Sequence, residues 1–543
     1  MIMIFLDFSK IPQNGEFFCK FIRGEKFAQS RFAEFSKIED KQFLSHKAQN
    51  FPNRQIARWI IAETMQSLDL SEKQRENISQ VSAANTLFVS TGQQVGFLGG
   101  ALYTCLKIAT AINIAKKLQQ QHPEIQFIPI FWLEDNDHDA KESAEVYIFD
   151  ANHHIRLFHP DYSTCENTPV SELVFDEKIE ETLGEVIEAL PYSQNKQELA
   201  DTLRSIYTKG KRWTDAMLEF YQTLFKNEGL LFASAATARK SGAIARLAEV
   251  NFASQNSFEQ LFDIFSQNRV LLENNGHTVN ISIDYFNYCK HLANKRYSIR
   301  TVSPENSLYS INHAIHTYSE IVSDMHQNPA DYSPKAILRP IFQEVCFPSA
   351  ASVLGPGEIS YFAMLKEAYE FFGVDFPPVA NRAMACFVPE RHIHFLEQNG
   401  FDLAHFFEPA NKFEQFLSSL VINDVSEGIF EQVKHEIQQN FSQLTDLLIN
   451  ADPSLVRTQE SYAHKTTELI ENLQKKYVAA LKKKNADFIG KLRKIHEIIL
   501  PNERLQERQI SPINFINIYG FDNFSKILNE IADNYVKGFI VYT

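Results

Sequence analysis

Apolar residues occupy nearly every position of one short stretch in the first third of the chain, and Phe88 and Val89 open another. This is the pattern of interior strands that are buried on both faces. The first stretch begins at about Phe88 and the second spans Phe127–Leu133, with a helix expected between them from about Leu102 to Lys117. The turn before that helix contains four glycines, Gly92, Gly96, Gly99 and Gly100. This order of elements predicts an α/β sheet with a site at the carboxyl ends of its strands.

A second transition from a strand to glycines occurs where an apolar run leads into Gly355-Pro-Gly357. Glu358 then opens a helix that is expected to continue through Phe372. The carboxylate of Glu358 either complements the dipole of that helix or contacts a ligand. Upstream, Arg339 stands directly before a proline, so it is not expected in the middle of a helix. Its planar guanidinium matches the two oxygens of a substrate carboxylate.

Beyond residue 411 the apolar positions recur every three or four residues, as in amphipathic helices. One series runs from Phe430 to Leu448 and a second from Tyr462 to Ile499, with Asp452-Pro453 between them. Two long helices joined at a proline turn predict an antiparallel helical hairpin, with a seam that a partner chain could share.

These patterns divide the 543 residues into five parts. We expect an N-terminal segment and the first half of the sheet in 1–150, a mainly helical insertion in 151–225, the second half of the sheet with inserted strands in 226–410, the helical hairpin in 411–500, and a C-terminal segment that docks on the core in 501–543. A chain of this length has room for a large core and more than one structural unit.

Charged residues follow the second buried strand directly, namely Glu134, Asp135, Asp137, His138 and Asp139. Burial and like charges shift proton affinities, so this cluster could act as acid and base, hold a substrate ammonium or bind a divalent metal. A solvated loop is the alternative without a function. No metal is expected, because contiguous ligands on one loop rarely encircle an ion and no Cys or His pair at ligand spacing accompanies them.

The glycine-rich turn after the first strand has a backbone that can approach a ligand closely. Its spacing is neither Gly-x-Gly-x-x-Gly nor a Walker loop, so it is weak as a nucleotide motif. A tight turn with packing glycines is the alternative. Gln93 and Gln94 favour a binding role, because their amides supply directional hydrogen bonds that a mere turn does not need.

Composition narrows the class of protein further. The formal net charge of −14 argues against a protein that coats nucleic acid. No run of about 18 apolar residues occurs, and the start of the chain lacks the cationic region of a signal peptide, so we expect a cytoplasmic protein that does not contact a membrane. The six cysteines are scattered without a Cys-x-x-Cys pair and are expected to be reduced.

Taken together, the motifs resemble those of a known family, the cysteine-adding enzymes BshC of bacillithiol biosynthesis. The motifs stand in the family's order along nearly the whole chain: Thr91-Gly-Gln-Gln94 with Gly96 and Leu102-Tyr-Thr104, Phe131-Trp132 before Asp137-His-Asp139, Leu338-Arg-Pro340 with Gln343-Glu344, Gly355-Pro-Gly-Glu358 with Tyr361, and Leu505-Gln-Glu-Arg508. Family members commonly have Glu where Asn136 stands, Pro where Ala101 stands, and an acidic residue in the loop occupied here by Ser234-Ala-Ala-Thr237.

The resemblance implies a Rossmann-like parallel-sheet core with inserted connecting segments, and a long antiparallel coiled-coil extension that makes a homodimer. It also implies a ligase that joins the carboxyl of cysteine, or of an activated cysteine, to the amine of glucosaminyl malate, giving bacillithiol. No motif of aminoacyl-adenylate chemistry is present, so the means of activation and the role of any nucleotide cofactor stay open. An acyl-adenylate or nucleotidyl transferase, a metal-dependent hydrolase and a non-catalytic scaffold are the alternatives.

For this reaction we expect His138 to act as the general base, with Asp137 and Asp139 stabilising its protonated form. Backbone N–H groups near the two glycine turns could hold an oxyanion or a phosphate. Arg339 and Lys107 are candidates for the malate carboxylates, and Gln93, Gln94, Gln343 and Tyr361 for the sugar hydroxyls. The full set of expected substrate-binding residues is Thr91, Gly92, Gln93, Gln94, Gly96, Tyr103, Lys107, Arg339, Gln343, Glu344, Gly355, Gly357, Glu358 and Tyr361.

Overall fold

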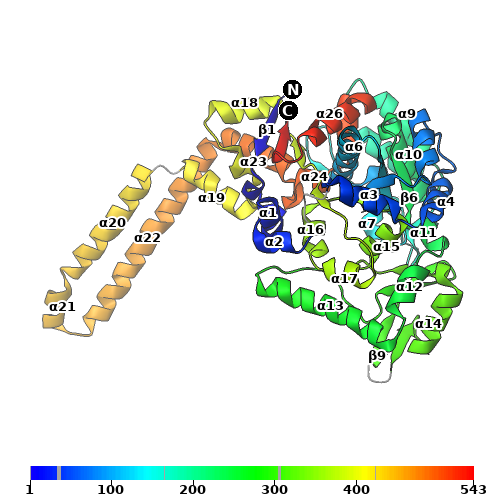
Figure 1. Cartoon of the computed structure of the whole chain (residues 1–543). Helices are drawn as coiled ribbons and strands as arrows, with labels where there is room; N and C mark the ends of the chain where they lie inside the picture. Colours follow the sequence, from blue (N-terminus) through cyan, green and yellow to red (C-terminus); the bar gives the residue numbers. More distant parts are fainter. Residues whose placement is uncertain (1, 33–37, 164, 304–306, 422–423) are drawn as a thin grey trace. The chain divides into compact units, whose positions relative to one another are not determined.

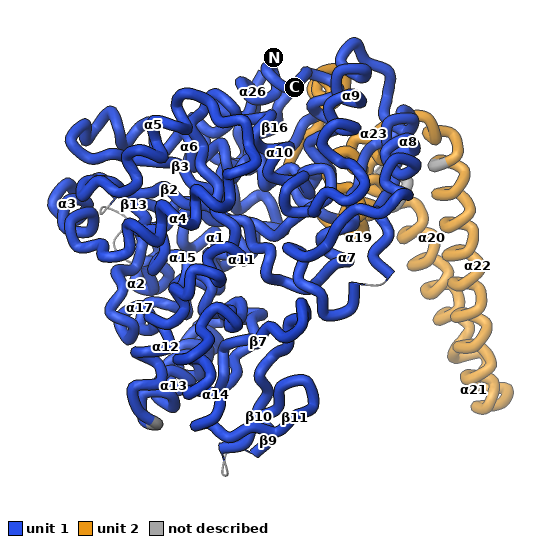
Figure 2. Tube along the Cα trace, turned by 90° about the vertical axis from the view of Figure 1, so that its right-hand side faces the viewer, with its two compact units in different colours: residues 1–387, 504–543 blue, residues 388–503 orange. Residues whose placement is uncertain are grey.

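The chain forms two compact units. The computed structural model describes residues 2–32, 38–163, 165–303, 307–421 and 424–543. Unit 1 comprises residues 1–387 and 504–543, and unit 2 comprises residues 388–503 (Figure 2). The second unit thus begins upstream of the helical hairpin.

A five-stranded parallel sheet forms the core of unit 1. Its strands are β2 (Thr86–Gln94), β3 (Gln126–Glu134), β6 (Leu231–Ser234), β13 (Ser349–Leu354) and β14 (Val379–Asn381), in the order β14-β13-β2-β3-β6. β2 and β3 pair from Thr86 opposite Gln126 to Gln94 opposite Glu134. Every strand is parallel to its neighbours, so the predicted Rossmann-like sheet is confirmed.

Helix α6 (Tyr103–Gln121) connects β2 to β3 and packs on both strands. Helix α26 (Phe521–Asp533) packs on α6 in turn, which explains why α6 is buried around most of its circumference. Helices α3 (Lys41–Gln49) and α4 (Arg54–Met65) contact β2 and β6 respectively. The apolar core between these layers includes Leu87, Val89, Leu118, Phe127 and Val353. Each such side chain stabilises the fold by about 1.5–3 kcal/mol.

The other helices of unit 1 include two that follow Gly355, α16 (Pro356–Phe362) and α17 (Lys366–Phe371). The prediction of a single helix through Phe372 is wrong. The helix is interrupted at residues 363–365, whose three side chains are all buried. Apart from the helices α8–α10, which are described with the insertions below, the further described helices are α1 (Glu16–Ile22), α2 (Lys26–Ser30), α5 (Glu72–Gln80), α7 (Ala140–Ala144), α11 (Ala235–Lys240), α12 (Ala245–Asn251), α13 (Gln255–Asn274), α14 (Tyr318–Gln327), α15 (Arg339–Cys346), α24 (Gln506–Gln509) and α25 (Ile513–Tyr519).

Two insertions interrupt the core. The first carries the antiparallel pair β4 (Val146–Phe149) and β5 (Ile155–Phe158), and the helices α8 (Ile179–Ala189), α9 (Lys196–Ile206) and α10 (Trp213–Phe225). The second carries two small antiparallel sheets. These are formed by β7 (Tyr288–Leu292), β8 (Lys295–Ser298) and β12 (Tyr332–Pro334), and by β9 (Arg300–Ser303), β10 (Leu308–Ile311) and β11 (Ala314–Thr317).

The two ends of the chain lie side by side in a further sheet (Figure 1). Strand β1 (Met3–Leu6) pairs antiparallel with β16 (Phe539–Tyr542), and β16 runs parallel to β15 (Ala385–Phe387). All four residues of β16 are buried. The last segment of the sequence is therefore an integral strand of unit 1.

Unit 2 is helical. Its helices are α18 (Glu390–Gln398), α19 (Ala410–Val421), α20 (Asp424–Ser442), α21 (Thr445–Ala451), α22 (Leu455–Lys484) and α23 (Ala486–Ile499). α20 and α21 pack along α22 after the chain reverses at Asp452-Pro453 (Figure 1), so the predicted antiparallel hairpin is confirmed. In the part of the chain that the structure describes, no helix has both the length and the apolar character needed to cross a bilayer.

Candidate active site

The carboxyl ends of the parallel strands bring the separate sequence motifs to one edge of the sheet. β2 ends at Gln94 and β3 at Glu134, and these two residues are paired in the register. The charged loop 135–139 follows β3, and Gly355 follows the end of β13. Ligands of parallel α/β proteins bind at this edge. Gln94, the charged loop and Gly355 therefore lie at one edge of the sheet.

Asp137 is the centre of the charged loop. Its Oδ2 lies 2.9 Å from Arg339 Nη2 and 3.3 Å from Gln94 Nε2. Its Oδ1 accepts the backbone N–H of His138 at 2.8 Å and lies 3.4 Å from Arg296 Nη1. Burial alone would raise the pKa of Asp137, but the two guanidinium groups outweigh it and hold that pKa well below its usual range. A divalent cation at Asp137 would have to displace two arginines.

Arg339 opens α15, with Pro340 in the first turn, and so does not lie in mid-helix. Its Nε lies 3.7 Å from Glu134 Oε2, an oxygen that also accepts the indole N–H of Trp132 at 3.3 Å. Burial alone would lower the pKa of Arg339, but the negative charges of Glu134 and Asp137 raise it further above its usual value. The Nε has no hydrogen-bond partner among the described residues. The guanidinium thus lies between the carboxylates of Glu134 and Asp137.

His138 differs from what its sequence neighbours suggest. Its Nδ1 lies 3.1 Å from Arg296 Nη1, and a guanidinium can only donate, so Nδ1 accepts and the neutral ring carries its proton on Nε2. Burial and the charge of Arg296 lower the pKa of His138, and Asp137 and Asp139 only partly oppose them. The protonated ring is disfavoured rather than stabilised. The side chain is 39% exposed, so a ligand can reach it.

The other two aspartates of the loop have structural contacts. Asp139 caps α7 and accepts the backbone N–H of Glu142 at 2.9 Å. Asp135 is buried and accepts the hydroxyl of Ser234 at 2.7 Å and the N–H of Ala236 at 2.8 Å, which fastens the loop to the end of β6. Burial raises the pKa of Asp135 to about 6.

A second charged group surrounds Lys107 on α6. The Lys107 ammonium donates to Gly92 O at 2.8 Å and to Gln93 Oε1 at 2.9 Å, and it lies 2.7 Å from Glu358 Oε2. Because an ammonium has three N–H bonds, these three acceptors use all of them. Burial lowers the pKa of Lys107 in spite of Glu358. Lys107 therefore holds the two glycine turns together and is not free for a malate carboxylate.

Tyr103 and a buried ion pair extend this second group. The Tyr103 ring lies 5.6 Å from Lys107 Nζ and 5.4 Å from the Arg382 guanidinium, and burial raises its pKa to about 12. Arg382 forms a double hydrogen bond with Glu507, at 2.5 and 2.9 Å. Arg508 contributes a further cation, whose pKa burial and Arg382 lower.

The glycine turns are closed rather than open to a ligand. The N–H of Gly96 donates to Met217 Sδ at 3.1 Å, and the N–H of Gly355 donates to Glu358 Oε2 at 2.8 Å. A Cβ at Gly96 would lie 2.6 Å from Gly100 Cα, so this glycine is required for packing. Gly92 belongs to β2, where a Cβ would lie 3.0 Å from Trp132 O. These positions explain the glycines without an oxyanion.

The remaining predicted residues are distributed as follows. Thr91 donates its hydroxyl to Val353 O at 2.9 Å and ties β2 to β13. Gly357 lies in the first turn of α16, in open space. Burial raises the pKa of Tyr361. The charge of Glu358 raises it further, and the charge of Arg339 opposes this rise. Gln343 and Glu344 lie on α15, and Glu344 pairs with Lys47 at 2.7 Å in a buried site beside the start of β13. Glu344 is therefore remote from the charged loop.

The sequence interpretation missed Arg296, Arg382 and Glu507 as parts of this edge. Arg296 comes from β8, 159 residues after Asp137. It stands in Asn294-Lys-Arg-Tyr297, which has no motif around it. Glu507 belongs to the Leu505-Gln-Glu-Arg508 motif, as does Arg508, so the sequence did contain a motif that could have indicated both residues.

The parallel sheet defines an α/β protein of the Rossmann-like class, and the charged side chains at its carboxyl edge form a candidate site for a small ligand. Residues 4–383 match the family described as bacillithiol biosynthesis BshC, N-terminal Rossmann-like domain, and residues 385–542 match its C-terminal coiled-coil domain. The chain belongs to the BshC family.

Similar proteins cover most of the chain. The proteins of Chlorobaculum tepidum, Chloroherpeton thalassium and Staphylococcus aureus are 26%, 28% and 27% identical to it. The matches cover 97%, 84% and 86% of this chain and 96%, 82% and 86% of the respective relatives. Each relative is named "Putative cysteine ligase BshC".

Proposed function

We propose that this protein is the cysteine ligase of bacillithiol biosynthesis and joins the carboxyl of cysteine to the amine of glucosaminyl malate. The observation that carries the proposal is the convergence of the family's motifs at one edge of the sheet, where Asp137, Arg339, Glu134 and Gln94 form one network. The names of the relatives supply the reaction class.

The reaction is an acyl transfer. Amide formation from a free carboxylate is uphill in water, so the cysteine carboxyl must carry a leaving group such as a phosphate or an adenylate. The sugar amine attacks the carboxyl carbon, the C–N bond forms, and the leaving group departs with its electron pair. The amine must first lose a proton. Charged side chains at the edge have to orient both substrates and accept this proton.

His138 is the proposed base. Its lowered pKa keeps the ring neutral near pH 7, as a base requires. The free lone pair of the neutral ring is on Nδ1, which lies 3.1 Å from Arg296 Nη1. Proton transfer to Nδ1 therefore requires that the ring turns away from Arg296 when the substrate binds.

Arg339 is the proposed contact for a malate carboxylate, because its guanidinium lies in the network of Asp137 and Glu134 at the carboxyl edge of the sheet. We propose Arg508 instead of Lys107 as a second contact for a malate carboxylate. All three N–H bonds of the Lys107 ammonium already have acceptors within the protein. Gln94, which donates to Asp137, is the proposed contact for a sugar hydroxyl, and Tyr361 on α16 is a further candidate.

We also propose a homodimer that forms through the helical hairpin. Apolar side chains on α21 and α22 are exposed, among them Leu447 at 67%, Leu469 at 68% and Leu473 at 55%. An apolar stripe of this kind on a long helix is typical of a coiled-coil seam.

The test of the ligase is a thiol profile of cells that lack this protein, with glucosaminyl malate and bacillithiol both measured by mass spectrometry. Glucosaminyl malate should accumulate and bacillithiol should disappear, and the wild-type chain should restore it while His138→Ala should not. Unchanged bacillithiol would contradict the proposal. Activity that survives replacement of both Asp137 and His138 would instead indicate a scaffold, and loss of activity with a chelator would indicate a metal-dependent enzyme.

A further inference from the structure

Arg296 reaches His138 from a small sheet of the second insertion. The sheet consists of β7, β8 and β12, with β7 in the centre. Arg296 on β8 is paired with His291 on β7, and Ser333 on β12 is paired with Cys289, two positions before His291. Side chains at paired positions, and at positions two apart on one strand, lie on the same face of a sheet. Arg296, His291 and Ser333 therefore share one face.

The inserted sheet holds the Arg296 guanidinium from behind. Its Nε lies 3.4 Å from Ser333 Oγ and its Nη2 lies 3.5 Å from Pro334 O, while the backbone N–H of Arg296 donates to Asn167 O at 2.8 Å. Ser333 Oγ lies 2.8 Å from His291 Nε2. Because a guanidinium can only donate, the hydroxyl proton of Ser333 is left for His291. Burial and neighbouring positive charges lower the pKa of His291 to about 2, so its neutral ring accepts that proton.

One nitrogen of Arg296 contacts two acceptors of the charged loop. Nη1 lies 3.1 Å from His138 Nδ1 and 3.4 Å from Asp137 Oδ1, and its two hydrogens can serve both. On the other side of the ring, His138 Nε2 has no hydrogen-bond partner among the described residues, and the side chain is 39% exposed. The ring therefore presents an N–H to a ligand.

Asp137 favours the opposite tautomer. Its Oδ1 lies 3.6 Å from His138 Nδ1. A carboxylate at this position ordinarily keeps the proton on Nδ1, as in a Ser-His-Asp triad. The other charged groups near the ring do not decide the matter, because Asp139 caps α7 and Arg339 donates to Oδ2, the second oxygen of Asp137. Arg296 is thus the group that keeps the proton off Nδ1.

The backbone of the loop does not depend on Arg296. The N–H of Val170 donates to Asp137 O at 2.8 Å, and the N–H of Ser171 donates to Asp135 O at 2.9 Å. The loop keeps these main-chain anchors when Arg296 is replaced. What the guanidinium adds is the direction and the protonation pattern of the side chains.

We propose that Arg296 is a positioning residue, which keeps His138 in the Nε2–H tautomer against the competing carboxylate of Asp137. Ser333 and His291 support it by holding the guanidinium in place. An N–H on Nε2 recognises an oxygen of the substrate, and this is the resting state from which the ring must turn to act as a base. The tautomer is a property of the chain without substrate, and only its catalytic consequence rests on the proposed ligase function.

The test observes the ring nitrogens of His138 by ¹⁵N NMR. The full-length protein is labelled at its 17 histidines and measured without substrate at about pH 8, well above the ordinary histidine pKa. The His138 signals are those that His138→Gln lacks. Wild type should show a protonated Nε2 and an unprotonated Nδ1. Arg296→Met should show the reverse, because Asp137 then accepts from Nδ1.

Ser333→Ala tests the support behind Arg296. The guanidinium loses one of its contacts in this variant but keeps those to Pro334 O and to the loop. The two tautomers should therefore exchange, and the ¹⁵N shifts of the two ring nitrogens of His138 should move toward each other.

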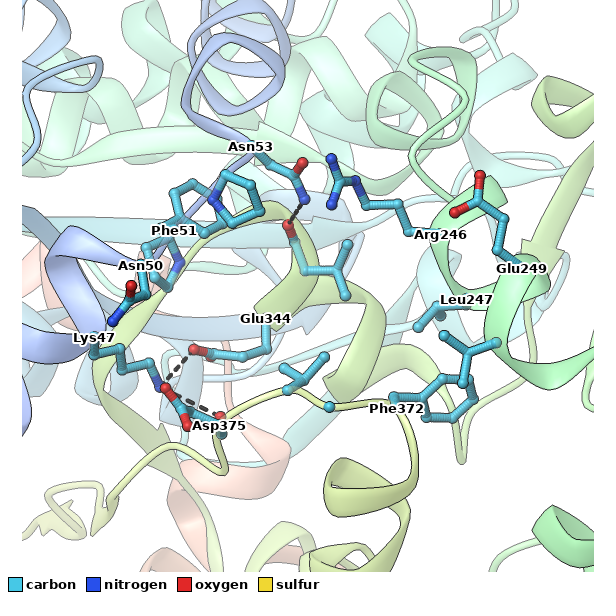
Figure 3. A pocket seen from close by; sticks show the side chains of 16 residues that line it. Lys47, Asn50, Phe51, Asn53, Arg246, Leu247, Glu249, Glu344, Phe372 and Asp375 are labelled. Carbon is cyan, nitrogen blue, oxygen red and sulfur yellow. Dashed lines mark hydrogen bonds and ion pairs between the residues drawn. The ribbon is translucent and has the colours of Figure 1, made fainter. Parts of the chain in front are cut away.

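Two control variants remove matched groups at the opposite end of β13. Arg246→Met removes an arginine from a pocket beside Pro348, the residue directly before β13 (Figure 3). Ser349→Ala removes a serine hydroxyl at the start of β13 that is as deeply buried as that of Ser333. Both variants should leave the His138 signals unchanged.

A protonated Nδ1 in wild type, or an unchanged tautomer in Arg296→Met, would overturn the proposal. If Arg296→Met does not fold, Ser333→Ala decides, and unshifted His138 signals in that variant would overturn it. In the ligase assay Arg296→Met should lower kcat by about 10²-fold with little change in KM for glucosaminyl malate, the effect of a misdirected group. A tautomer that reverses in a protein without ligase activity would contradict the proposed function and support this inference.

Discussion

Arg339 and Asp137 are 202 residues apart in the sequence and form an ion pair with Nη2 2.9 Å from Oδ2. Each side chain is 18% exposed, so the pair is largely withdrawn from water. It joins the start of α15 to the loop after β3. Through it, the second half of the sheet fixes the geometry of a loop that belongs to the first half.

This pair should show strong energetic coupling. Arg339→Met and Asp137→Asn each leave one largely buried charge without its partner, and each should destabilise the fold by about 2–3 kcal/mol. The double variant should lose clearly less than the sum of the two. A double-mutant cycle by urea denaturation measures this coupling. Strictly additive losses would show that Arg296 alone neutralises Asp137.

The activity of His138 should depend on Arg296. His138→Ala should lower the ligase rate by about 10²–10⁴-fold if the ring is the base. Burial and the charge of Arg296 lower the pKa of His138, so the acidic limb of the pH–rate profile should lie below the ordinary histidine value. Arg296→Met removes one cause of that lowering, so it should raise the pKa of His138 and move the limb to higher pH.

The control for this experiment is His138→Gln, which offers a hydrogen-bond donor without a base. If His138→Gln keeps the wild-type rate, the ring only donates from Nε2 to a substrate oxygen, and another group removes the proton. An acidic limb that Arg296→Met leaves in place would show that a group other than His138 titrates in the profile.

Lys107 should matter for stability more than for substrate affinity. Its three N–H bonds are used by Gly92, Gln93 and Glu358, so Lys107→Met leaves Glu358 without its cation and unfastens the two glycine turns. We expect a loss of about 3 kcal/mol in the free energy of unfolding. Glu358→Gln, which retains an acceptor for Gly355 N–H, should cost less. Lys107→Met with wild-type stability and a raised KM for glucosaminyl malate would show that Lys107 binds substrate after all.

The fold could be predicted from the sequence where burial alone decides the structure. β3 is apolar on both faces and β2 contains the apolar run Leu87–Val89, and only a covered parallel sheet accepts strands that are buried on both faces. The hairpin of unit 2 could be predicted because its apolar period is regular and Pro453 stands at the reversal. α16 and α17 could not be predicted as two helices, since the break at residues 363–365 depends on tertiary packing.

The site could be predicted only in part, because residues that are close in the sequence can direct their side chains to different parts of the fold. Glu344 follows Arg339 by five residues, and five residues of α-helix rotate a side chain by about 140° and advance it by about 7.5 Å. Glu344 therefore pairs with Lys47 instead of joining Asp137. Arg296 reaches Asp137 from an inserted sheet, and no local pattern in its strand indicates that partner.

The homodimer should separate when charge is placed on the hairpin. Leu469→Glu with Leu473→Glu puts two carboxylates on an apolar stripe whose members are 68% and 55% exposed in a single chain. Analytical ultracentrifugation should show a dimer for wild type and a monomer for this variant. Lys475→Glu is the control, since it adds a carboxylate at an exposed polar position of the same helix and should leave the dimer intact. A wild-type monomer would remove the dimer from the proposal.

Asp135 should make stability depend on pH. Its pKa is about 6 in the folded chain and about 3.9 when unfolded, so folding favours its protonated form. The corresponding stabilisation is complete below about pH 3.9 and is lost as the pH rises through 6. Asp135→Asn cannot ionise and still offers an oxygen to Ala236 N–H. It should therefore become more stable than wild type above pH 6, with an upper limit of about 3 kcal/mol.

Urea denaturation of wild type and Asp135→Asn across this range measures the effect, and the difference between the two curves removes the contributions of all other carboxylates. The difference should grow between about pH 4 and pH 6 and then level off. Because Ser234 at the end of β6 and Ala236 of α11 donate to the carboxylate, Ser234→Ala should enlarge the difference by raising the pKa of Asp135 further. A difference that stays constant with pH would mean that this aspartate titrates at its ordinary value in the folded protein.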